Sequence, residues 1–275
     1  MDWLIFTDLD GTLLDHETYA FDAALESLKV LKERGIPVVI VTSKTFAEVD
    51  ELRTLLGLNY PFIIENGAAI YFPKEYVVQT PEYPWQDLEE SLVIQDEYFA
   101  YPLAPKFEFW KSLSVEIIEQ FGCACRPFSH MNVDEVSELT GLSLAESKNA
   151  KKRGYSDPIH WFGSDELYDS FKSKMAADGL EAVRGGRFVH LLKGTDKGLA
   201  VQWLIDFYNV PRKNSPKVMV LGDGDNDISM LNLADFPVLV RSKSHGFPTI
   251  DSNERYQTIH YGPEGWSEAI RKFII

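Results

Sequence analysis

Basic residues and long apolar runs are both scarce in this sequence. Lysine and arginine together number 27, against 42 aspartates and glutamates, so the formal net charge is −15. Without a broad cationic surface, the chain is not expected to bind nucleic acid or anionic lipid, and an anionic ligand must meet local cations or a metal. The apolar runs at residues 38–41 and 218–221 are far shorter than the roughly 20 residues that a membrane helix needs. We therefore expect a soluble protein without membrane contact.

Cysteine is also rare. Only Cys123 and Cys125 occur, separated by one residue, which provides neither a disulfide framework nor a CxxC zinc pair. The apolar run at residues 3–6 is preceded by Asp2 and followed by two more aspartates, unlike a secretory signal with its basic start. These features predict reduced thiols and a cytoplasmic location. The sequence does not indicate an oligomeric state.

The 275 residues predict about two domains. At both ends of the chain, apolar β-branched runs alternate with segments of helical apolar spacing, which favours an α/β fold with a parallel sheet. The expected strands are residues 3–7, 38–42, 62–64, 218–221 and 237–240. The expected helices are residues 23–33, 46–56 and 197–208, with a short helix from Asp227; a hairpin-like stretch covers residues 68–71.

The middle of the chain has a different pattern, rich in aromatics and prolines. Ser143 followed by Glu146 is a capping-box helix start. Beyond it we expect a strand at residues 159–162, a helix at 164–175, and a hairpin of residues 180–183 and 188–192 around Gly185 and Gly186. The predicted organisation is a Rossmann-like parallel-sheet core, residues 1–80 and 190–275, with an inserted α/β cap domain, residues 81–189.

The motif DLDGT, residues 8–12, directly follows the first expected strand. In an open parallel sheet, ligands gather beyond the carboxyl ends of the strands, so Asp8 and Asp10 would face the active crevice. The motif alone is equally compatible with a solvated turn, because aspartate and glycine are common turn residues.

A second acidic motif, GDGDND at residues 222–227, follows another apolar strand. Its clustered oxygen-bearing side chains suit a hard cation such as Mg²⁺. A calcium EF-hand loop is excluded because its sixth position would be Ile228, and a dinucleotide-binding GxGxxG is excluded because its third glycine would be Asp227. The remaining alternative is an acidic helix cap.

Two further residues suit an anionic ligand. Lys197 is expected in the first turn of a helix, where a lysine opposes the helix dipole. Ser43 follows the second strand, where a hydroxyl and backbone amides can hold phosphate. Taken alone, Lys197 could be an ordinary surface lysine and Ser43 a helix cap.

The order of these motifs resembles the haloacid dehalogenase superfamily: DLDGT, a hydroxyl residue after the second strand, a lysine after an insertion, and then GDGDND. The insertion resembles a type IIB cap. The segments TSKT, ELTGLS, KKRGYSDP and GGRFVHL resemble the mannosyl-3-phosphoglycerate phosphatase family within it. The chain departs from the superfamily pattern at Ala68, where a second glycine is expected, and at Gly224 and Asp225, which replace a more usual serine and proline.

This resemblance implies a phosphatase in which Asp8 is the nucleophile and Asp10 the general acid and base, while Ser43 and Lys197 hold the phosphate oxygens. Mg²⁺ would be the cofactor. Its implied ligands are Asp8, Asp10 through its carbonyl, and Asp223. Asp227 belongs to the same metal site, where it would support these ligands or orient Lys197. A small anionic sugar phosphate is the expected partner. Its candidate binding residues are Lys44, Thr45, Asn66, Arg153 and Arg187, with weaker candidates at Arg184 and His190.

The substrate implied by the resemblance is mannosyl-3-phosphoglycerate. Alternatives are a phosphatase acting on glucosyl-3-phosphoglycerate, sucrose phosphate or trehalose phosphate, and a phosphomutase that uses the same aspartyl-phosphate. A non-catalytic phosphosugar sensor is an alternative of another class, because a fold alone does not establish function.

Overall fold

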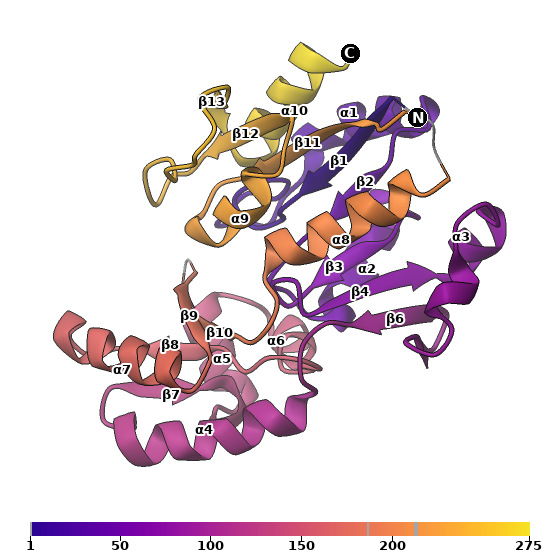
Figure 1. Ribbon diagram of the computed structural model, residues 1–275. Coiled ribbons are helices and arrows are strands. Elements are labelled where there is room, and N and C mark those ends of the chain that lie inside the picture. The colour runs from indigo at the N-terminus through magenta and orange to yellow at the C-terminus, as the bar shows by residue number, and fades with distance from the viewer. Residues whose placement is uncertain (1, 186, 212–213) are drawn as a thin grey trace.

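A parallel sheet forms the centre of the molecule (Figure 1). The computed structural model describes residues 2–185, 187–211 and 214–275. The strands of this sheet are all parallel, and their order across it differs from their order in the chain. Across the sheet they are β13 (Tyr256–Tyr261), β12 (Phe236–Arg241), β11 (Lys217–Gly222), β1 (Trp3–Thr7) and β2 (Val38–Ile40). This confirms the predicted α/β class.

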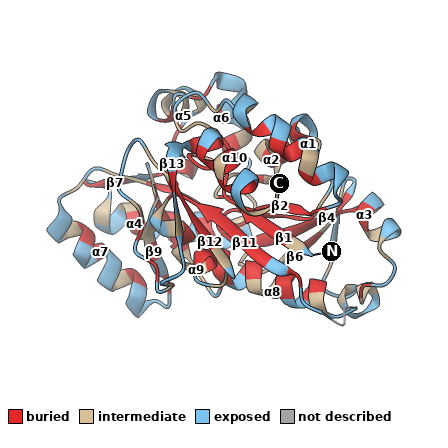
Figure 2. Cartoon of the chain, turned by 90° about the horizontal axis from the view of Figure 1, so that it is seen from above, coloured by how far each residue is buried: buried red, intermediate tan, exposed pale blue. Residues whose placement is uncertain are grey.

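Helices cover both faces of the sheet, so its strands are buried on both sides (Figure 2). In β1, Ile5 belongs to one apolar cluster while Leu4 and Phe6 belong to the other, as expected when successive side chains alternate between faces. The Ile5 face is covered by α1 (Leu25–Glu33), α2 (Phe46–Leu56) and α10 (Gly262–Phe273). The opposite face is covered by α8 (Lys197–Asn209) and α9 (Ile228–Leu231).

A second, antiparallel sheet extends this core. Its order is β3 (Phe62–Ile64), β4 (Ala69–Pro73), β6 (Tyr98–Pro102) and β5 (Val93–Gln95), with α3 (Lys74–Gln79) after β4. A parallel bridge between Val41 and Ile63 joins it to the end of β2. Tyr83 and Ala100 are buried in the two core clusters. Because β5 and β6 complete a sheet with β3 and β4, we propose that the core continues past the predicted boundary at residue 81.

The cap has its own four-stranded antiparallel sheet (Figure 1). The order is β7 (Cys125–Pro127), β8 (Ile159–Trp161), β10 (Val189–Leu192) and β9 (Glu181–Arg184). The long helices α4 (Phe107–Phe121) and α7 (Asp165–Ala177) pack on it through one apolar cluster, and the shorter α5 (Val133–Thr140) and α6 (Leu144–Ala150) contribute to another.

Local predictions for the cap agree with its structure. Ser143 and Glu146 form the expected capping box at the start of α6, and β9 pairs with β10 as the expected hairpin. Gly186, predicted in the hairpin turn, lies outside the described residues. Because β10 pairs with β8 and β9, the cap extends past residue 189. We therefore propose a cap from α4 to β10.

Among the helices of the described residues, none combines the length and the apolar composition required to cross a membrane.

Trp266 on α10 supports the strand that leads to Asp8. It is fully buried, and its Nε1 donates a hydrogen bond to Thr7 Oγ1 at 3.0 Å. Trp266→Phe should lower the free energy of unfolding by about 1–3 kcal/mol, because a buried acceptor loses its donor and part of the ring volume is left empty. Denaturant unfolding measures the effect. Val78→Ala, at a position 79% exposed, is the control and should change stability by no more than about 0.5 kcal/mol. Equal stability of both variants would contradict this role for Trp266.

Candidate active site

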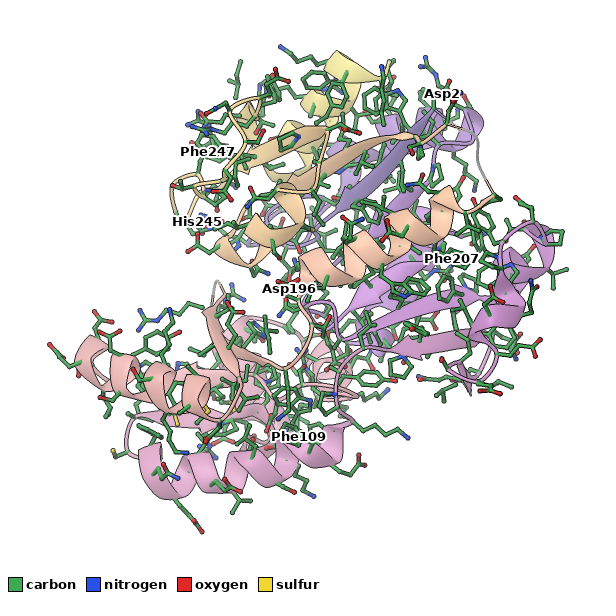
Figure 3. All side chains as sticks on the ribbon, viewed as in Figure 1. Asp2, Phe109, Asp196, Phe207, His245 and Phe247 are labelled. Carbon is green, nitrogen blue, oxygen red and sulfur yellow. The ribbon has the colours of Figure 1, made fainter. Side chains whose placement is uncertain are left out.

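The carboxyl ends of β1, β2 and β11 meet beneath the cap. There the structure contains a cavity of about 140 Å³ whose walls come from both the core and the cap. Seven of the residues predicted for the site line it: Asp8, Asp10, Ser43, Lys44, Arg153, Arg187 and Asp223. Figure 3 shows the two parts of the molecule and labels Asp196, where the chain returns from the cap to α8.

Three buried carboxylates lie together at the base of the site. Asp8, Asp223 and Asp227 each offer one oxygen within 4.8 Å of the others. Backbone N–H groups of Asp223 and Gly224 donate to Asp227 Oδ2 at 3.0 and 3.1 Å, which fixes its orientation. Gly11 has a left-handed φ of 83°, and a Cβ at this position would lie 2.4 Å from Asp223 Oδ2. The DLDGT turn therefore needs glycine both for its backbone and for the approach of Asp223.

Lys197 is the cation of this group. It begins α8, its side chain is fully buried, and Nζ lies 2.7 Å from Asp8 Oδ1 and 2.6 Å from Asp227 Oδ1. Burial alone would lower the pKa of Lys197, but the carboxylates of Asp227 and Asp8 raise it above its ordinary value. Lys197 therefore stays charged. Because its side chain is buried, it is not the ordinary surface lysine that its sequence position also allowed.

The charges of this group fit a divalent cation. Three buried carboxylates face one buried ammonium, and the other basic group beside them, His245, meets only Asp223, at 3.3 Å. Burial raises the pKa of Asp8 well above its ordinary value; Lys197 opposes this shift, while Asp227 and Asp223 add to it. A hard cation would bind these oxygens and relieve their repulsion. Asp8 and Asp223 have the clearest access, because Asp227 already accepts from two backbone amides and Lys197.

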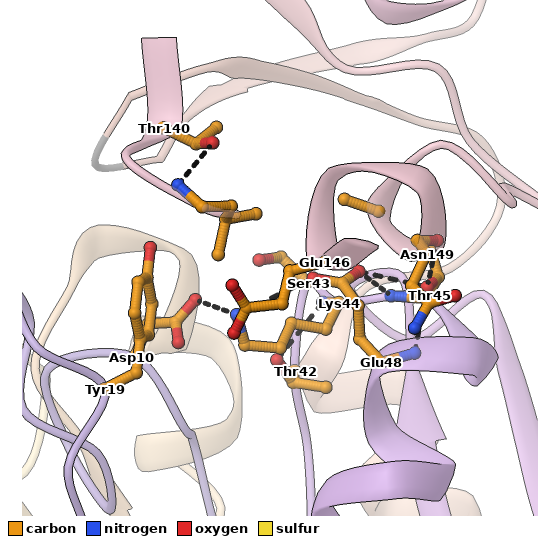
Figure 4. A network of polar contacts seen from close by, with 12 residues as sticks. Asp10, Tyr19, Thr42, Ser43, Lys44, Thr45, Glu48, Thr140, Glu146 and Asn149 are labelled. Atoms are coloured by element: carbon orange, nitrogen blue, oxygen red, sulfur yellow. Dashed lines mark hydrogen bonds and ion pairs between the residues drawn. The ribbon is translucent and has the colours of Figure 1, made fainter. Parts of the chain in front are cut away.

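The Asp10 carboxylate is separate from this trio. Its Oδ2 lies 2.9 Å from Lys44 Nζ (Figure 4), and its buried Oδ1 has no hydrogen-bond partner among the described residues. A metal contact from Asp10 would thus use its main chain, as the family resemblance implies. Asp10 also lines the cavity, where a molecule bound there can meet it.

Cations from the core and the cap face the same cavity. Lys44 lies between Asp10 and Glu48, with its ammonium 4.8 Å from the centre of the Tyr19 ring. Arg153 Nη1 donates to the Ser43 carbonyl at 2.7 Å, so a cap arginine reaches the loop that carries Ser43. Arg187 donates to Tyr19 Oη at 3.2 Å and also to the Thr140 carbonyl. Cationic side chains of the core and of the cap therefore line the same cavity.

Two of the predicted substrate-binding residues are not brought to this cavity. Thr45 caps α2, accepting from Glu48 N–H and donating to the Asn149 carbonyl of the cap at 3.0 Å, as Figure 4 shows. Asn66 lies behind the acidic loop, where its Oδ1 accepts from Asn226 Nδ2 at 3.3 Å. Thr45 therefore makes a contact between core and cap, and Asn66 supports the acidic loop. The weak candidate Arg184 pairs with Asp165 and also lies outside the cavity lining.

The cavity also contains residues that the sequence did not single out or ranked low. Tyr19 carries a left-handed φ of 57° and meets both Lys44 and Arg187. His245 Nε2 lies 3.3 Å from Asp223 Oδ2. His190, the other weak candidate, lines the cavity, and burial, aided by nearby Arg153 and Lys197, lowers its pKa to about 3, so it is neutral. Neither Tyr19 nor His245 lies in a motif with a recognisable spacing.

With this geometry in view, the class is clear: the chain matches the haloacid dehalogenase-like hydrolase family over residues 5–248 and belongs to it. A glucosyl-3-phosphoglycerate/mannosyl-3-phosphoglycerate phosphatase of Persephonella marina is 34% identical over 272 residues, covering 98% of this chain and 97% of the relative. An enzyme of the same name from Methanococcoides burtonii is 34% identical over 277 residues, covering 100% and 98%. The predicted superfamily and the phosphoric monoester hydrolase class agree with these matches.

Solved structures show the same fold. A sugar phosphatase described as subclass IIB of this superfamily superposes with a TM-score of 0.64 at 20% identity, covering 98% of both chains. The sucrose-phosphatase of Synechocystis superposes with a TM-score of 0.63 at 18% identity, covering 99% of this chain and 98% of the other. At these identities the likeness concerns the fold alone.

Removing one carboxylate of the trio tests whether it holds a cation. A ligand that binds only the folded state stabilises it by about 2.7 kcal/mol at 100 times its Kd. We expect Mg²⁺ to raise the unfolding temperature of the wild-type protein, and Asp223→Asn to lose most of this rise because a ligand oxygen of full charge is gone. Thermal unfolding in a Mg²⁺ titration, started from chelator-treated protein, measures both.

The control is Asp169→Asn on the exposed face of α7, which should respond to Mg²⁺ like the wild type. If Asp223→Asn were stabilised as strongly as the wild type, the trio would not be the cation site.

Proposed function

We propose that this protein is a Mg²⁺-dependent phosphatase that hydrolyses a glycosyl-3-phosphoglycerate, with mannosyl-3-phosphoglycerate as the first candidate, through a phosphorylated Asp8. The observation that carries the proposal is the position of Asp8 in the cavity, beside Lys197 and together with Asp10 in the same lining. The names of the two relatives support the substrate class and include both the mannosyl and the glucosyl compound.

The first step forms a bond between an Asp8 oxygen and phosphorus while the phosphorus–oxygen bond to the glycerate breaks. Asp10 donates its proton to the departing oxygen and then, in the second step, accepts a proton from the water that attacks phosphorus and releases Asp8. Splitting hydrolysis in this way lets one carboxyl group serve as both acid and base. When bound, Mg²⁺ supplies positive charge that reduces repulsion between the Asp8 carboxylate and the phosphate dianion.

Ser43 and Lys197 would hold the phosphate oxygens. Ser43 lines the cavity, and Lys197 Nζ already donates to Asp8 Oδ1 at 2.7 Å, close to the place where phosphorus must arrive. Charge spreads over these oxygens during transfer, so preorganised donors there stabilise the transition state. Asp227 keeps Lys197 oriented through its 2.6 Å contact.

A glycosyl-phosphoglycerate carries a carboxylate that a plain hexose phosphate lacks. Lys44, Arg153 and Arg187 offer three cations in the cavity wall for such a group, and the planar guanidinium suits a carboxylate in particular. This argues for the glycerate-bearing class over sucrose phosphate or trehalose phosphate. A phosphomutase would use the same aspartyl-phosphate, whereas a non-catalytic sensor would need neither Asp8 as a nucleophile nor Asp10 as an acid, so the presence of both argues against a sensor. An assay of released phosphate separates a phosphatase from both alternatives. The cytoplasm remains the proposed location.

The decisive experiment compares phosphate release from several esters by the wild type and by Asp8→Asn in the presence of Mg²⁺. Mannosyl- and glucosyl-3-phosphoglycerate should have the highest kcat/KM, above sucrose phosphate, trehalose phosphate and hexose phosphates. Asp8→Asn should fold normally, as judged by circular dichroism, but release no phosphate above background, because no nucleophile remains. A parental rate in Asp8→Asn would overturn the covalent mechanism. A higher kcat/KM for sucrose phosphate would overturn only the substrate class.

Asp10→Asn separates proton transfer from nucleophilic attack. General acid–base catalysis contributes about 10²–10⁴-fold, so kcat for a glycosyl-phosphoglycerate should fall by that factor. For an aryl phosphate, whose leaving group needs little protonation, formation of the phosphorylated enzyme should fall far less. Rapid-quench measurement of that first step on both substrates tests the difference. Equal losses in the first step would exclude Asp10 as the acid.

A further inference from the structure

A turn between β3 and β4 of the core has a strained backbone and contacts the cap beside the active site. Glu65, Asn66 and Gly67 have φ angles of 48°, 59° and 91°, so three successive residues adopt the left-handed conformation. Glycine does so readily, but a residue as large as glutamate rarely does. Such backbone strain persists only where the surrounding structure holds it in place, and it clusters at functional sites.

Each residue of this turn contacts a different part of the site. Asn66 Oδ1 accepts from Asn226 Nδ2 in the acidic loop. The Gly67 carbonyl accepts from Thr195 Oγ1 at 2.9 Å, and a Cβ at Gly67 would lie 1.9 Å from the Asp196 carbonyl, at the start of the helix that carries Lys197. Glu65 turns the other way, toward the cap. The turn therefore meets the acidic loop, the start of α8 and the cap at one place.

Glu65 places a buried carboxylate against a loop of the cap. It is 2% exposed; Oε1 accepts from Gly154 N–H at 2.8 Å, and Oε2 accepts from Tyr155 N–H at 3.1 Å and from the Ser156 hydroxyl. The chain passes between core and cap at residues 103–106 and 193–196, so this contact is separate from both connections. A buried carboxylate that receives three donors from the cap is a strong attachment between the two parts.

Arg153 directly precedes this loop. Its Nη1 donates to the Ser43 carbonyl at 2.7 Å and its Nε to the Ala150 carbonyl at 3.1 Å, while its Nη2 has no hydrogen-bond partner among the described residues. The guanidinium lines the cavity with one edge available to a ligand. Because Glu65 holds the backbone of the next residue, Gly154, it determines where this guanidinium can reach.

We propose that Glu65 is a positioning residue: it docks residues 154–156 of the cap on the core and thereby holds Arg153 where its guanidinium binds the anionic substrate. The proposal rests on the proposed function for its choice of substrate but not for the docking itself. Glu65 touches no reacting atom and acts through Arg153. According to this proposal, the segment ENG of the core binds the segment KKRGYSD of the cap, although the two are far apart in the sequence.

The kinetic test is a double-mutant cycle of Glu65→Ala and Arg153→Ala, with mannosyl-3-phosphoglycerate and 4-nitrophenyl phosphate as substrates. Glu65→Ala should raise KM for the glycosyl-phosphoglycerate by about tenfold or more, the effect of losing one hydrogen bond to a charged group. For the aryl phosphate, which has no carboxylate, kcat should stay within about twofold. The double variant should be no worse than Arg153→Ala alone. Glu65→Gln, which keeps one acceptor oxygen, should recover part of the loss.

Limited trypsin digestion tests docking without reference to any substrate. Lys151, Lys152 and Arg153 offer cleavage sites that the docked loop should protect, and Glu65→Ala should expose them at temperatures where the protein remains folded. The matched control is Glu51→Ala, which removes another core carboxylate that accepts from the cap, from Asn149 Nδ2 at 3.0 Å. It should leave digestion and kinetics unchanged.

Three results would overturn the proposal. Unchanged protection in Glu65→Ala would mean that Glu65 does not dock the loop. Additive losses in the cycle, or equal losses on both substrates, would mean that it does not act through Arg153. If the wild type hydrolysed no glycosyl-phosphoglycerate, the proposed function would fail, while digestion would still decide the docking. In that case the same cycle is measured with the best ester of the panel, where additive losses again exclude positioning.

Discussion

The contact of Lys197 with Asp8 and Asp227 is the interaction on which the site depends. Its two short ion pairs, 2.7 and 2.6 Å, join the ends of two neighbouring parallel strands to the first turn of α8. A buried lysine without partners would be strongly destabilising, and so would three buried carboxylates without a cation. Each is tolerated because of the other. The remaining excess of negative charge explains why the site suits a divalent ion.

The cap completes a cavity that the core alone leaves open. The acidic groups come from the core, whereas two of the three cations at the wall, Arg153 and Arg187, come from the cap. In the proposed function, phosphate chemistry would therefore belong to the core, and recognition of the rest of the substrate largely to the cap. Contacts such as Thr45 with Asn149, and Arg153 with the Ser43 carbonyl, set the distance between them.

The sequence predicted those helices and strands that are marked by apolar spacing, helix caps or turn residues. The strand that ends at Asp8, the capping box at Ser143 and the β9–β10 hairpin all follow from apolar spacing or from turn chemistry. No sequence feature of β5 and β6 distinguishes pairing with the β4 side of the core from pairing within the cap, so the extent of each domain depends on the tertiary structure. The sequence predicts Thr45 and Asn66 on the core side of the crevice; it does not predict that Thr45 caps α2 or that Asn66 accepts a hydrogen bond from Asn226 in the acidic loop.

The sequence by itself determined the fold class and the chemical groups at the strand ends: Asp8, Asp10, Ser43 and the acidic loop. Parallel strands bring their carboxyl ends to one edge, so motif order alone places these residues together. Only the tertiary structure decided how Lys197 pairs, which residues of the cap reach the cavity, and that Glu65, Tyr19 and His245 belong near it. These contacts join residues up to about two hundred positions apart through loops, whose paths depend on packing of the whole chain and not on any local pattern.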